Sequence, residues 1–315
     1  MAHLIESMMY VREEPWHGLG QKLEAECTSA EALKAAGMDW EIELRKVYRD
    51  DEMGRSILIP EKRAVVRKTD GRCYNVVGDQ YTPVQNAQAF AFFDAVVGTG
   101  QAVYHTAGSI ANGAKVWILA KLPTIGAVRA VDLMENYLLL VNGHDGSLSF
   151  QMLWTPIRVV CNNTLVRALG KTNGQVFVTR HSPNIQARVD IAQQTLGITT
   201  QKFETFMAMA ERIAGQSFLK AEMDEFLKKV LDFKPDVPPE KQPHKVAALN
   251  RIEELVEVGA GLQQVEIRGT KWALYNALTE WVDHERFDNR DRALNSAWFG
   301  SGADMKAKAW ELIQN

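Results

Sequence analysis

The chain has few cysteines and no long apolar run. Its three cysteines, Cys27, Cys73 and Cys161, stand far apart without a C-x-x-C pair, so neither a disulfide framework nor a cysteine-based zinc site is encoded. No window approaches the roughly eighteen uninterrupted apolar residues of a membrane span, and the first residues lack the pattern of a secretion signal. We therefore expect a cytoplasmic protein without a membrane partner.

Metal and cofactor signatures are also missing. None of the seven histidines pairs with another at i, i+4, and no carboxylate lies at a useful spacing. The stretch from Gly108 to Lys115 spaces its glycines like a phosphate loop, but Ala114 separates Gly113 from the lysine and a strand pattern follows. We predict no metal and no cofactor, and we interpret the stretch as a hairpin turn.

Local patterns predict strands in the first part of the chain. Thr69-Asp70-Gly71 and Asn112-Gly113 are turn sequences between alternating apolar segments, because their central residues tolerate positive φ. Thr28 or Ser29 is expected to cap a helix that Gly37 closes, and residues 85–97 predict a second short helix.

The remainder of the chain is predicted to be helical. The helical pattern runs from about residue 184 to 230 with a break near Gly197, and a proline-rich loop follows at 231–246. Trp272, Leu274, Leu278 and Trp281 share one later helix and are expected to be buried. The fold class is therefore α+β: an antiparallel or mixed sheet with a packed helix in a domain at 1–183, then a helical region at 184–315.

Positive charge is concentrated between residues 95 and 189. This segment holds eight lysines and arginines against three carboxylates, a net +5, whereas the whole chain is −3 and the rest is therefore −8. Such separation of sign is typical of a surface that meets an anion. The slightly acidic total argues against a protein that coats duplex DNA by charge alone, so any contact with a polyanion must be local.

We therefore predict a non-enzymatic protein that binds single-stranded nucleic acid as a homo-oligomer. Aromatic side chains among cations are the combination that single-strand binders use for base stacking and phosphate contact. The equal alternative is that the aromatics belong to the core and that the cations pair with acidic helices. The predicted contact residues are Lys115, Lys121, Arg158, Arg167, Lys171, Arg180 and Arg188 for phosphates, with Tyr104 and Trp154 for bases.

Two other functions stay open. Cys161 ends a strand pattern and opens a helix, where unpaired N–H groups would stabilise a thiolate, and His144 could serve as its base in an enzyme acting on nucleic acid or a nucleotide. A lone cysteine after apolar residues is more often a small buried hydrophobe. The other alternative is a protein-binding factor that counteracts a host defence through acidic helices or exposed tryptophans.

Several short segments stand out as landmarks of the chain. They are Pro15-Trp16-His17-Gly18-Leu19-Gly20, Tyr81-Thr82-Pro83-Val84-Gln85-Asn86, Thr106-Ala107-Gly108-Ser109, His144-Asp145-Gly146, the stretch from Arg158 to Leu165, and the stretch from Tyr275 to His284. Together they resemble the phage/plasmid-like protein family of unknown function, encoded by phages, prophages and plasmids. The resemblance implies a protein of a mobile element, whose genes often serve DNA replication, recombination or counter-defence. Strands followed by helices, with cations near the junction, are broadly similar in architecture to the single-strand annealing proteins of the RecT and Red-beta type.

Overall fold

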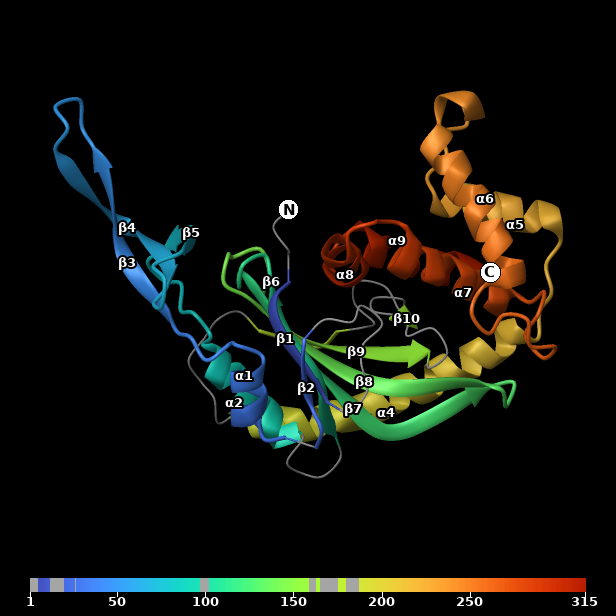
Figure 1. Cartoon of the computed structure of the whole chain (residues 1–315), viewed down its shortest axis with the longest axis horizontal. Coiled ribbons are helices and arrows are strands. Elements are labelled where there is room, and N and C mark those ends of the chain that lie inside the picture. The colour runs from blue at the N-terminus through green and yellow to red at the C-terminus, as the bar shows by residue number, and fades with distance from the viewer. Residues whose placement is uncertain are drawn as a thin grey trace. The chain divides into compact units, whose positions relative to one another are not determined.

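The computed structural model describes residues 5–11, 20–25, 27–96, 102–158, 163–164, 175–179 and 187–315 (Figure 1). Strands dominate the first half and helices the second, so the predicted α+β class is confirmed. None of the helices in these ranges combines the length and apolarity needed to cross a bilayer.

Eleven strands are assigned within the described ranges. They form an eight-stranded sheet of order β10-β9-β8-β7-β6-β1-β2, in which β11 also pairs with β9, and a separate three-stranded sheet of order β3-β4-β5. The strands are β1 (Ile5–Val11), β2 (Gln21–Leu23), β3 (Ile42–Asp50), β4 (Ser56–Arg67), β5 (Cys73–Gly78), β6 (Val103–Ile110), β7 (Lys115–Val128), β8 (Asp132–Gly143), β9 (Phe150–Arg158), β10 (Asn163–Thr164) and β11 (Gln175–Thr179).

Most helices follow the last strand. Two short ones, α1 (Ser29–Ala35) and α2 (Asn86–Val96), lie among the strands. The others are α4 (Ala187–Ala214), α5 (Lys220–Val230), the 3₁₀ turn η2 (Pro239–Lys241), α6 (Pro243–Val258), α7 (Lys271–Glu280), the π-helical turn η3 (Trp281–Glu285), α8 (Arg290–Phe299) and α9 (Ser301–Ile313).

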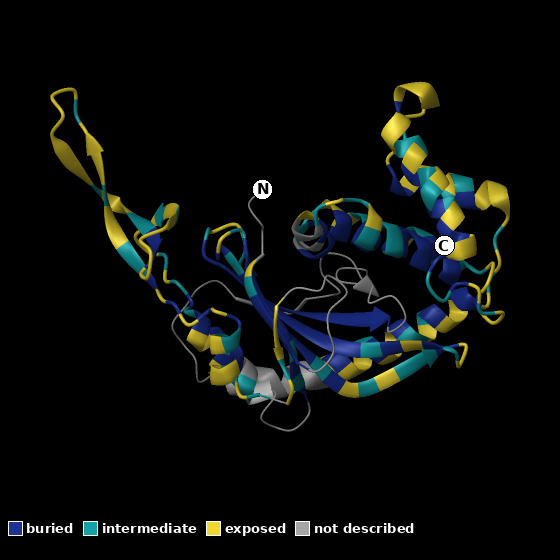
Figure 2. Ribbon diagram, viewed as in Figure 1, coloured by how far each residue is buried: buried dark blue, intermediate teal, exposed yellow. Residues whose placement is uncertain are grey.

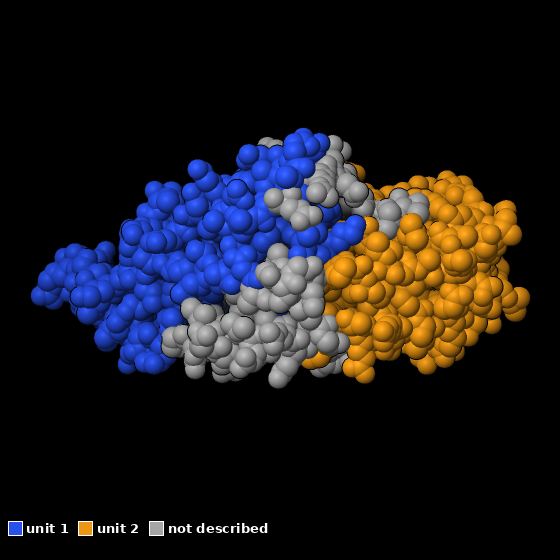
Figure 3. Space-filling view, turned by 90° about the horizontal axis from the view of Figure 1, so that it is seen from below, with its two compact units in different colours: residues 1–121, 138–153, 176–196 blue, residues 122–137, 154–175, 197–315 orange. Residues whose placement is uncertain are grey.

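The chain forms two compact units (Figure 3). Unit 1 comprises residues 1–121, 138–153 and 176–196, and unit 2 comprises residues 122–137, 154–175 and 197–315. This division differs from the predicted boundary between residues 183 and 184, because stretches of β7, β8 and β9 contribute to unit 2 as well as to unit 1. Composition along the sequence can indicate only a boundary between two contiguous segments, and each of these units is built from three separate segments.

Both predicted hairpins are present. β4 and β5 pair on either side of Thr69-Asp70-Gly71, and β6 and β7 pair from Ile110 opposite Lys115 outward. Asn112 and Gly113 have φ of 56° and 85°, the left-handed region that Asn and Gly tolerate best. A Cβ at Gly113 would lie 2.5 Å from the Tyr74 hydroxyl oxygen, so a larger residue is excluded there by space as well as by backbone angle.

Helix ends agree with the sequence in part. Thr28 caps α1 in a reciprocal capping box with Glu31, and Gly37 follows the helix with φ of 61°. The predicted break at Gly197 is wrong: α4 continues through it to Ala214, because one interior glycine costs only about 1 kcal/mol of helix stability. The proline-rich loop ends earlier than predicted, since Pro243 occupies the first turn of α6, where its missing N–H is not needed.

Unit 2 is centred on an aromatic cluster. Phe206 of α4 stacks on Trp310 of α9 with ring centroids 5.0 Å apart and meets Trp272 of α7 edge-on at 6.1 Å. Tyr275 contacts Trp310 at 5.0 Å. The predicted burial of Trp272, with Leu274 and Leu278, is confirmed, whereas Trp281 is only half-buried.

Tyr275 makes alkaline pH destabilising. Its hydroxyl is buried without a hydrogen-bond partner among the described residues, and burial, aided by the nearby Asp283 charge, raises its pKa well above the ordinary value. The folded state therefore keeps this phenol protonated, while the unfolded chain ionises it above about pH 10. We expect Tyr275 to lower the free energy of unfolding by about 1 kcal/mol at pH 11 relative to pH 9.

Urea unfolding of wild type and Tyr275→Phe between pH 8 and 11 measures this contribution. Other groups also titrate in this range, so the informative quantity is the difference between the two proteins. That difference should shift in favour of the phenylalanine variant as pH rises above 10. Parallel pH profiles for the two proteins would show that Tyr275 does not titrate differently on unfolding.

Candidate functional site

Arg158, predicted to contact phosphate, is a core residue of unit 2. Its Nε donates to both carboxylate oxygens of Asp132, at 2.8 and 2.7 Å, and its Nη1 donates to the Ala260 carbonyl at 2.7 Å. Both charged side chains are 0% exposed. The prediction for Arg158 is therefore wrong. Strand alternation directs it away from its apolar neighbours, but β9 is buried on both faces, so the opposite face is also interior.

Tyr104 and Trp154, predicted to stack on bases, are also buried. Tyr104 is 3% exposed, and its hydroxyl donates to Asp94 Oδ1 at 2.7 Å. Trp154 is 1% exposed, and its Nε1 donates to Asn136 Oδ1 at 2.6 Å. Stacking needs an exposed ring face, so the alternative interpretation of these aromatics as core residues is correct.

The other predicted contact residues stay predictions. Lys115 and Lys121 are half-buried on β7, six residues apart and hence on one side of the strand. Arg188 lies in the first turn of α4. The remaining three, and the candidate nucleophile, lie outside the described residues: Arg167, Lys171, Arg180 and Cys161.

His144 is a buried hydrogen-bonding residue of unit 1. It is 0% exposed, its Nε2 lies 2.9 Å from Asn86 Oδ1, and its ring meets Trp40 edge-on at 5.3 Å. Asn86 is held in turn by donating its Nδ2 to the Met38 carbonyl at 3.0 Å. These contacts tie the turn after β8 to the start of α2, which is a structural role.

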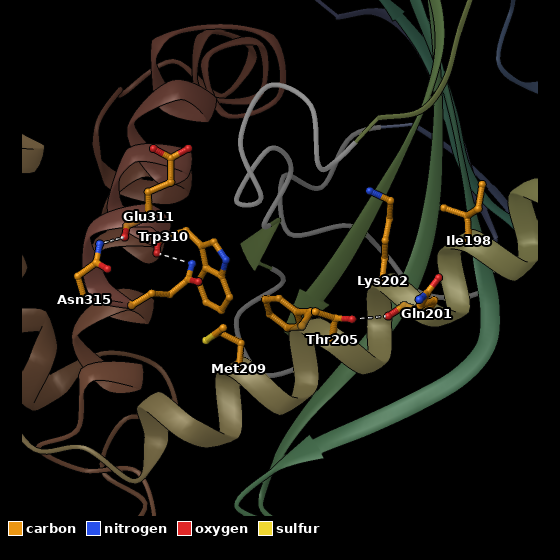
Figure 4. Close-up of a pocket in the computed structure, with 10 residues that line it drawn as sticks. Ile198, Gln201, Lys202, Thr205, Met209, Trp310, Glu311 and Asn315 are labelled. Atoms are coloured by element: carbon orange, nitrogen blue, oxygen red, sulfur yellow. Dashed lines mark hydrogen bonds between the residues drawn. The ribbon is translucent and has the colours of Figure 1, made fainter.

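A groove in unit 2 is the candidate binding site. It lies between α4 and the last turn of α9 and encloses about 600 Å³ (Figure 4). On α4 the lining residues recur every three or four positions, which places them on one helical face. They are Ile198, Gln201, Lys202, Thr205, Phe206 and Met209 on α4, with Trp310, Glu311, Gln314 and Asn315 at the C-terminal end.

The groove has an apolar wall and a polar rim. Ile198 is 41% exposed and Met209 is half-buried, while Trp310 closes the floor against Phe206. Gln314 Nε2 and Asn315 Nδ2 donate to backbone carbonyls one turn earlier in the chain, at 2.7 and 3.1 Å. These two bonds use only the amide nitrogens. The amide oxygens of the same side chains can therefore accept hydrogen bonds from a ligand.

Lys202 supplies the positive charge of the groove. Burial lowers the pKa of its ammonium group from the ordinary lysine value, because the charged form has lost part of its hydration. In Figure 4, Lys202 extends from α4. The Glu311 carboxylate, on α9, points away from Met209, which lies on α4. An anion bound beside Lys202 would compensate the lost hydration and raise its pKa again.

The groove has the size and lining of a ligand-binding site. A cavity of this size with apolar walls and a few polar groups fits a small molecule or one residue of a polymer. Within the described part of the chain, no three His, Cys, Asp or Glu side chains gather as metal ligands. Sequence reasoning missed the groove, although the stripe on α4 was readable, because nothing local indicates that the end of α9 lies opposite it.

The sequence profile of a domain of unknown function, DUF932, matches residues 73–303. The matched stretch is well over half of the 315-residue chain. The chain belongs to the DUF932 family. No curated protein and no solved structure matches it.

The DUF932 region contains only part of the groove. It includes the α4 wall, from Ile198 to Met209, and ends before Trp310 and the other α9 residues. It also begins after β3 and β4. The opposite wall of the groove and the β3–β4 hairpin thus lie outside the stretch that defines DUF932 membership.

Proposed function

We propose that the chain binds single-stranded nucleic acid without a chemical step and holds one nucleotide in the groove between α4 and α9. The groove itself is the observation that carries this proposal. The proposal extends to a cytoplasmic role for the protein of a phage, prophage or plasmid, and to promotion of strand annealing during recombination or replication.

The chemistry of the groove fits a nucleotide. A planar base can lie against Ile198 and Met209, since thioethers and aliphatic groups contact aromatic rings favourably. The amide oxygens of Gln314 and Asn315 can accept hydrogen bonds from base amino groups, and Lys202 can neutralise a phosphate. Unstacked bases that can enter such a site are found in single strands rather than in duplexes.

The charge of the surrounding sequence also supports an anionic ligand. The burial of Arg158 does not diminish the excess between residues 95 and 189, because its partner Asp132 belongs to the same segment. Seven cations and two carboxylates remain, which is again a net +5. One more cation, Arg129, is engaged by Glu211 at 3.4 Å. With both pairs set aside, six cations and two carboxylates remain, a net +4, and this local excess in the sequence favours contact with a polyanion.

Binding of a fluorescent single-stranded oligonucleotide at low salt tests the proposal. We expect Thr205→Trp, which fills the groove from an exposed position on α4, to weaken binding by about tenfold or more, the loss of roughly one stacked base. Ala208→Trp places the same side chain on α4 at an exposed position that does not line the groove, and should bind like wild type.

Salt dependence tests the role of Lys202. Replacing it with glutamine should reduce the slope of log affinity against log salt by about 0.7, the value for one phosphate contact on a single strand. Tight binding that is insensitive to both Thr205→Trp and Lys202→Gln would move the site away from the groove. No binding at low salt would remove nucleic acid as the ligand.

The basic segment is tested separately. Reversing Arg167, Lys171 and Arg180 to glutamate should weaken binding, whereas reversing three exposed cations outside the segment should not, although the net charge changes equally. Lys34, Lys234 and Lys241 provide this control. Arg158 is unsuitable for such a test because its replacement removes a core ion pair.

A further inference from the structure

The β3–β4 hairpin has a two-stranded end that no other strand covers. β5 pairs with β4 only from Lys62 to Val66, so beyond that point β3 and β4 pair only with each other. We refer to residues 47–59 as the distal hairpin. Figure 2 shows exposed residues along both of its strands. An isolated two-stranded hairpin is marginally stable in water, and both of its edges are open to pairing.

The distal hairpin exposes large apolar side chains. Tyr48 is 54% exposed, and Leu58, directly opposite it in the register, is 41% exposed. Met53 at the tip is 80% exposed. Three such side chains on one short ribbon form an apolar surface of the kind that protein partners cover.

One face of β3 is self-complementary in charge. Lys46, Tyr48 and Asp50 are alternate residues of β3. The register with β4 shifts between Lys46 and Val47, where β4 holds the extra residues, so alternation along β3 itself places the three on one face. If a second, antiparallel copy meets this face with its own Tyr48 opposite Tyr48, each Lys46 lies opposite Asp50 of the other copy. A two-fold axis between the two Tyr48 side chains relates the copies. The pairing of Lys46 with Asp50 therefore occurs twice in the dimer.

The present environment of Lys46 leaves it without an anion. It is exposed, has no ion-pair partner among the described residues, and lies directly opposite the cation Arg63 in the register. Like charges in cross-strand positions are destabilising. Asp50 accepts a hydrogen bond from Ser56 Oγ at 2.8 Å and keeps its negative charge for a further partner.

The tip and the stem of the hairpin carry opposite net charges. Residues 50–55 at the tip hold three carboxylates and Arg55, a net −2, whereas the stem at 42–46 and 60–66 holds four cations and two carboxylates, a net +2. Arg67 is left out of this count because it is buried and paired with Glu6 and Asp70. An antiparallel pair of hairpins sets each acidic tip against the basic stem of the other copy. Nucleic acid, in contrast, would be repelled by the tip.

We propose that a second copy of this chain docks on the distal hairpin, forming a two-fold dimer in which Tyr48 packs on Tyr48 and Lys46 pairs with Asp50 of the other copy. The dimer does not depend on nucleic-acid binding in the groove, which belongs to unit 2. It supplies the self-association that strand annealing would use, since repeated weak contacts along one strand add to a tight complex.

Sedimentation equilibrium of the full chain tests the dimer. Wild type should show a concentration-dependent monomer–dimer equilibrium. Lys46→Glu and Asp50→Lys each place like charges at both contacts, and each should raise the dissociation constant about tenfold or more. Far-UV circular dichroism confirms that each variant is folded.

Charge exchange separates pairing from unspecific damage. The double variant Lys46→Glu/Asp50→Lys restores opposite charges at both contacts and should dimerise again. Mixing the two single variants should yield a heterodimer, because one carries two anions and the other two cations on this face. Lys68→Glu is the matched control: it reverses an exposed cation directly after β4, paired with Glu41, and should dimerise like wild type.

A wild-type chain that is monomeric at 100 μM, on the order of the weakest specific dimers, overturns the proposal. So does a dimer that both single variants leave unchanged, since its interface would then lie elsewhere. Failure of the double variant and of the mixture to dimerise would equally reject the pairing of Lys46 with Asp50. A self-association that appears only when oligonucleotide is added would replace the protein partner with nucleic acid.

Discussion

Replacing Arg158 with methionine is expected to lower the free energy of unfolding by about 3–5 kcal/mol. The substitution keeps an elongated side chain but leaves the Asp132 carboxylate buried without its cation; Trp272 Nε1 donates to Asp132 Oδ2 at 2.7 Å. An uncompensated buried charge is costly because it has lost its hydration without gaining a counter-charge. Urea unfolding followed by tryptophan fluorescence measures the loss.

The double variant Arg158→Met/Asp132→Asn should recover much of this loss, because no buried charge then remains. Arg129→Met is the matched control: Arg129 pairs with Glu211 across 3.4 Å, but it is 43% exposed, and surface pairs contribute about 1 kcal/mol or less. A loss at Arg158 no larger than at Arg129 would contradict the assignment of a core ion pair. The same experiment shows why a binding defect in an Arg158 variant would report on folding.

Replacing Lys306 with methionine is expected to be similarly destabilising, by about 3–5 kcal/mol. Lys306 Nζ lies 2.6 Å from Asp283 Oδ1, and the side chains are 0% and 2% exposed. Burial lowers the pKa of Lys306, while the nearby Asp283 charge opposes that shift. The ammonium group therefore depends on the carboxylate, and removing Lys306 takes this buried counter-charge away from Asp283.

Lys308→Met, two residues later on α9, is the control for this position. Lys308 is paired with Asp232, but the two side chains are 38% and 80% exposed, so the expected loss is about 1 kcal/mol or less. Lys306→Met/Asp283→Asn should be more stable than Lys306→Met alone. If the single Lys306 variant unfolds at the same urea concentration as Lys308→Met, the pair at Asp283 does not stabilise the fold.

The elements that sequence reasoning predicted well are those whose conformation is set by a few neighbouring residues. The turn at Asn112-Gly113 and the cap at Thr28 depend on local backbone angles and on hydrogen bonds within four positions. The break at Gly197 failed because tertiary packing along α4 outweighs the small helix penalty of one glycine.

The candidate site was less accessible to sequence reasoning. A helical stripe from Ile198 to Met209 can be read from the sequence, but a stripe with a lysine and an exposed isoleucine does not reveal whether it packs or remains open. The second wall comes from Trp310, one hundred residues further along the chain. Sequence reasoning likewise did not predict the hairpin at residues 47–59 or its exposure on both faces.

By itself, the order of residues determined the α+β class, the hairpin turns, the capped first helix and the uneven distribution of charge. Only the tertiary structure decided that Arg158, Tyr104 and Trp154 are interior and that the ends of α4 and α9 enclose a groove. The physical reason is range: a turn depends on its own backbone angles, whereas burial depends on partners such as Asp132 and Trp272, which the chain brings together only when it folds.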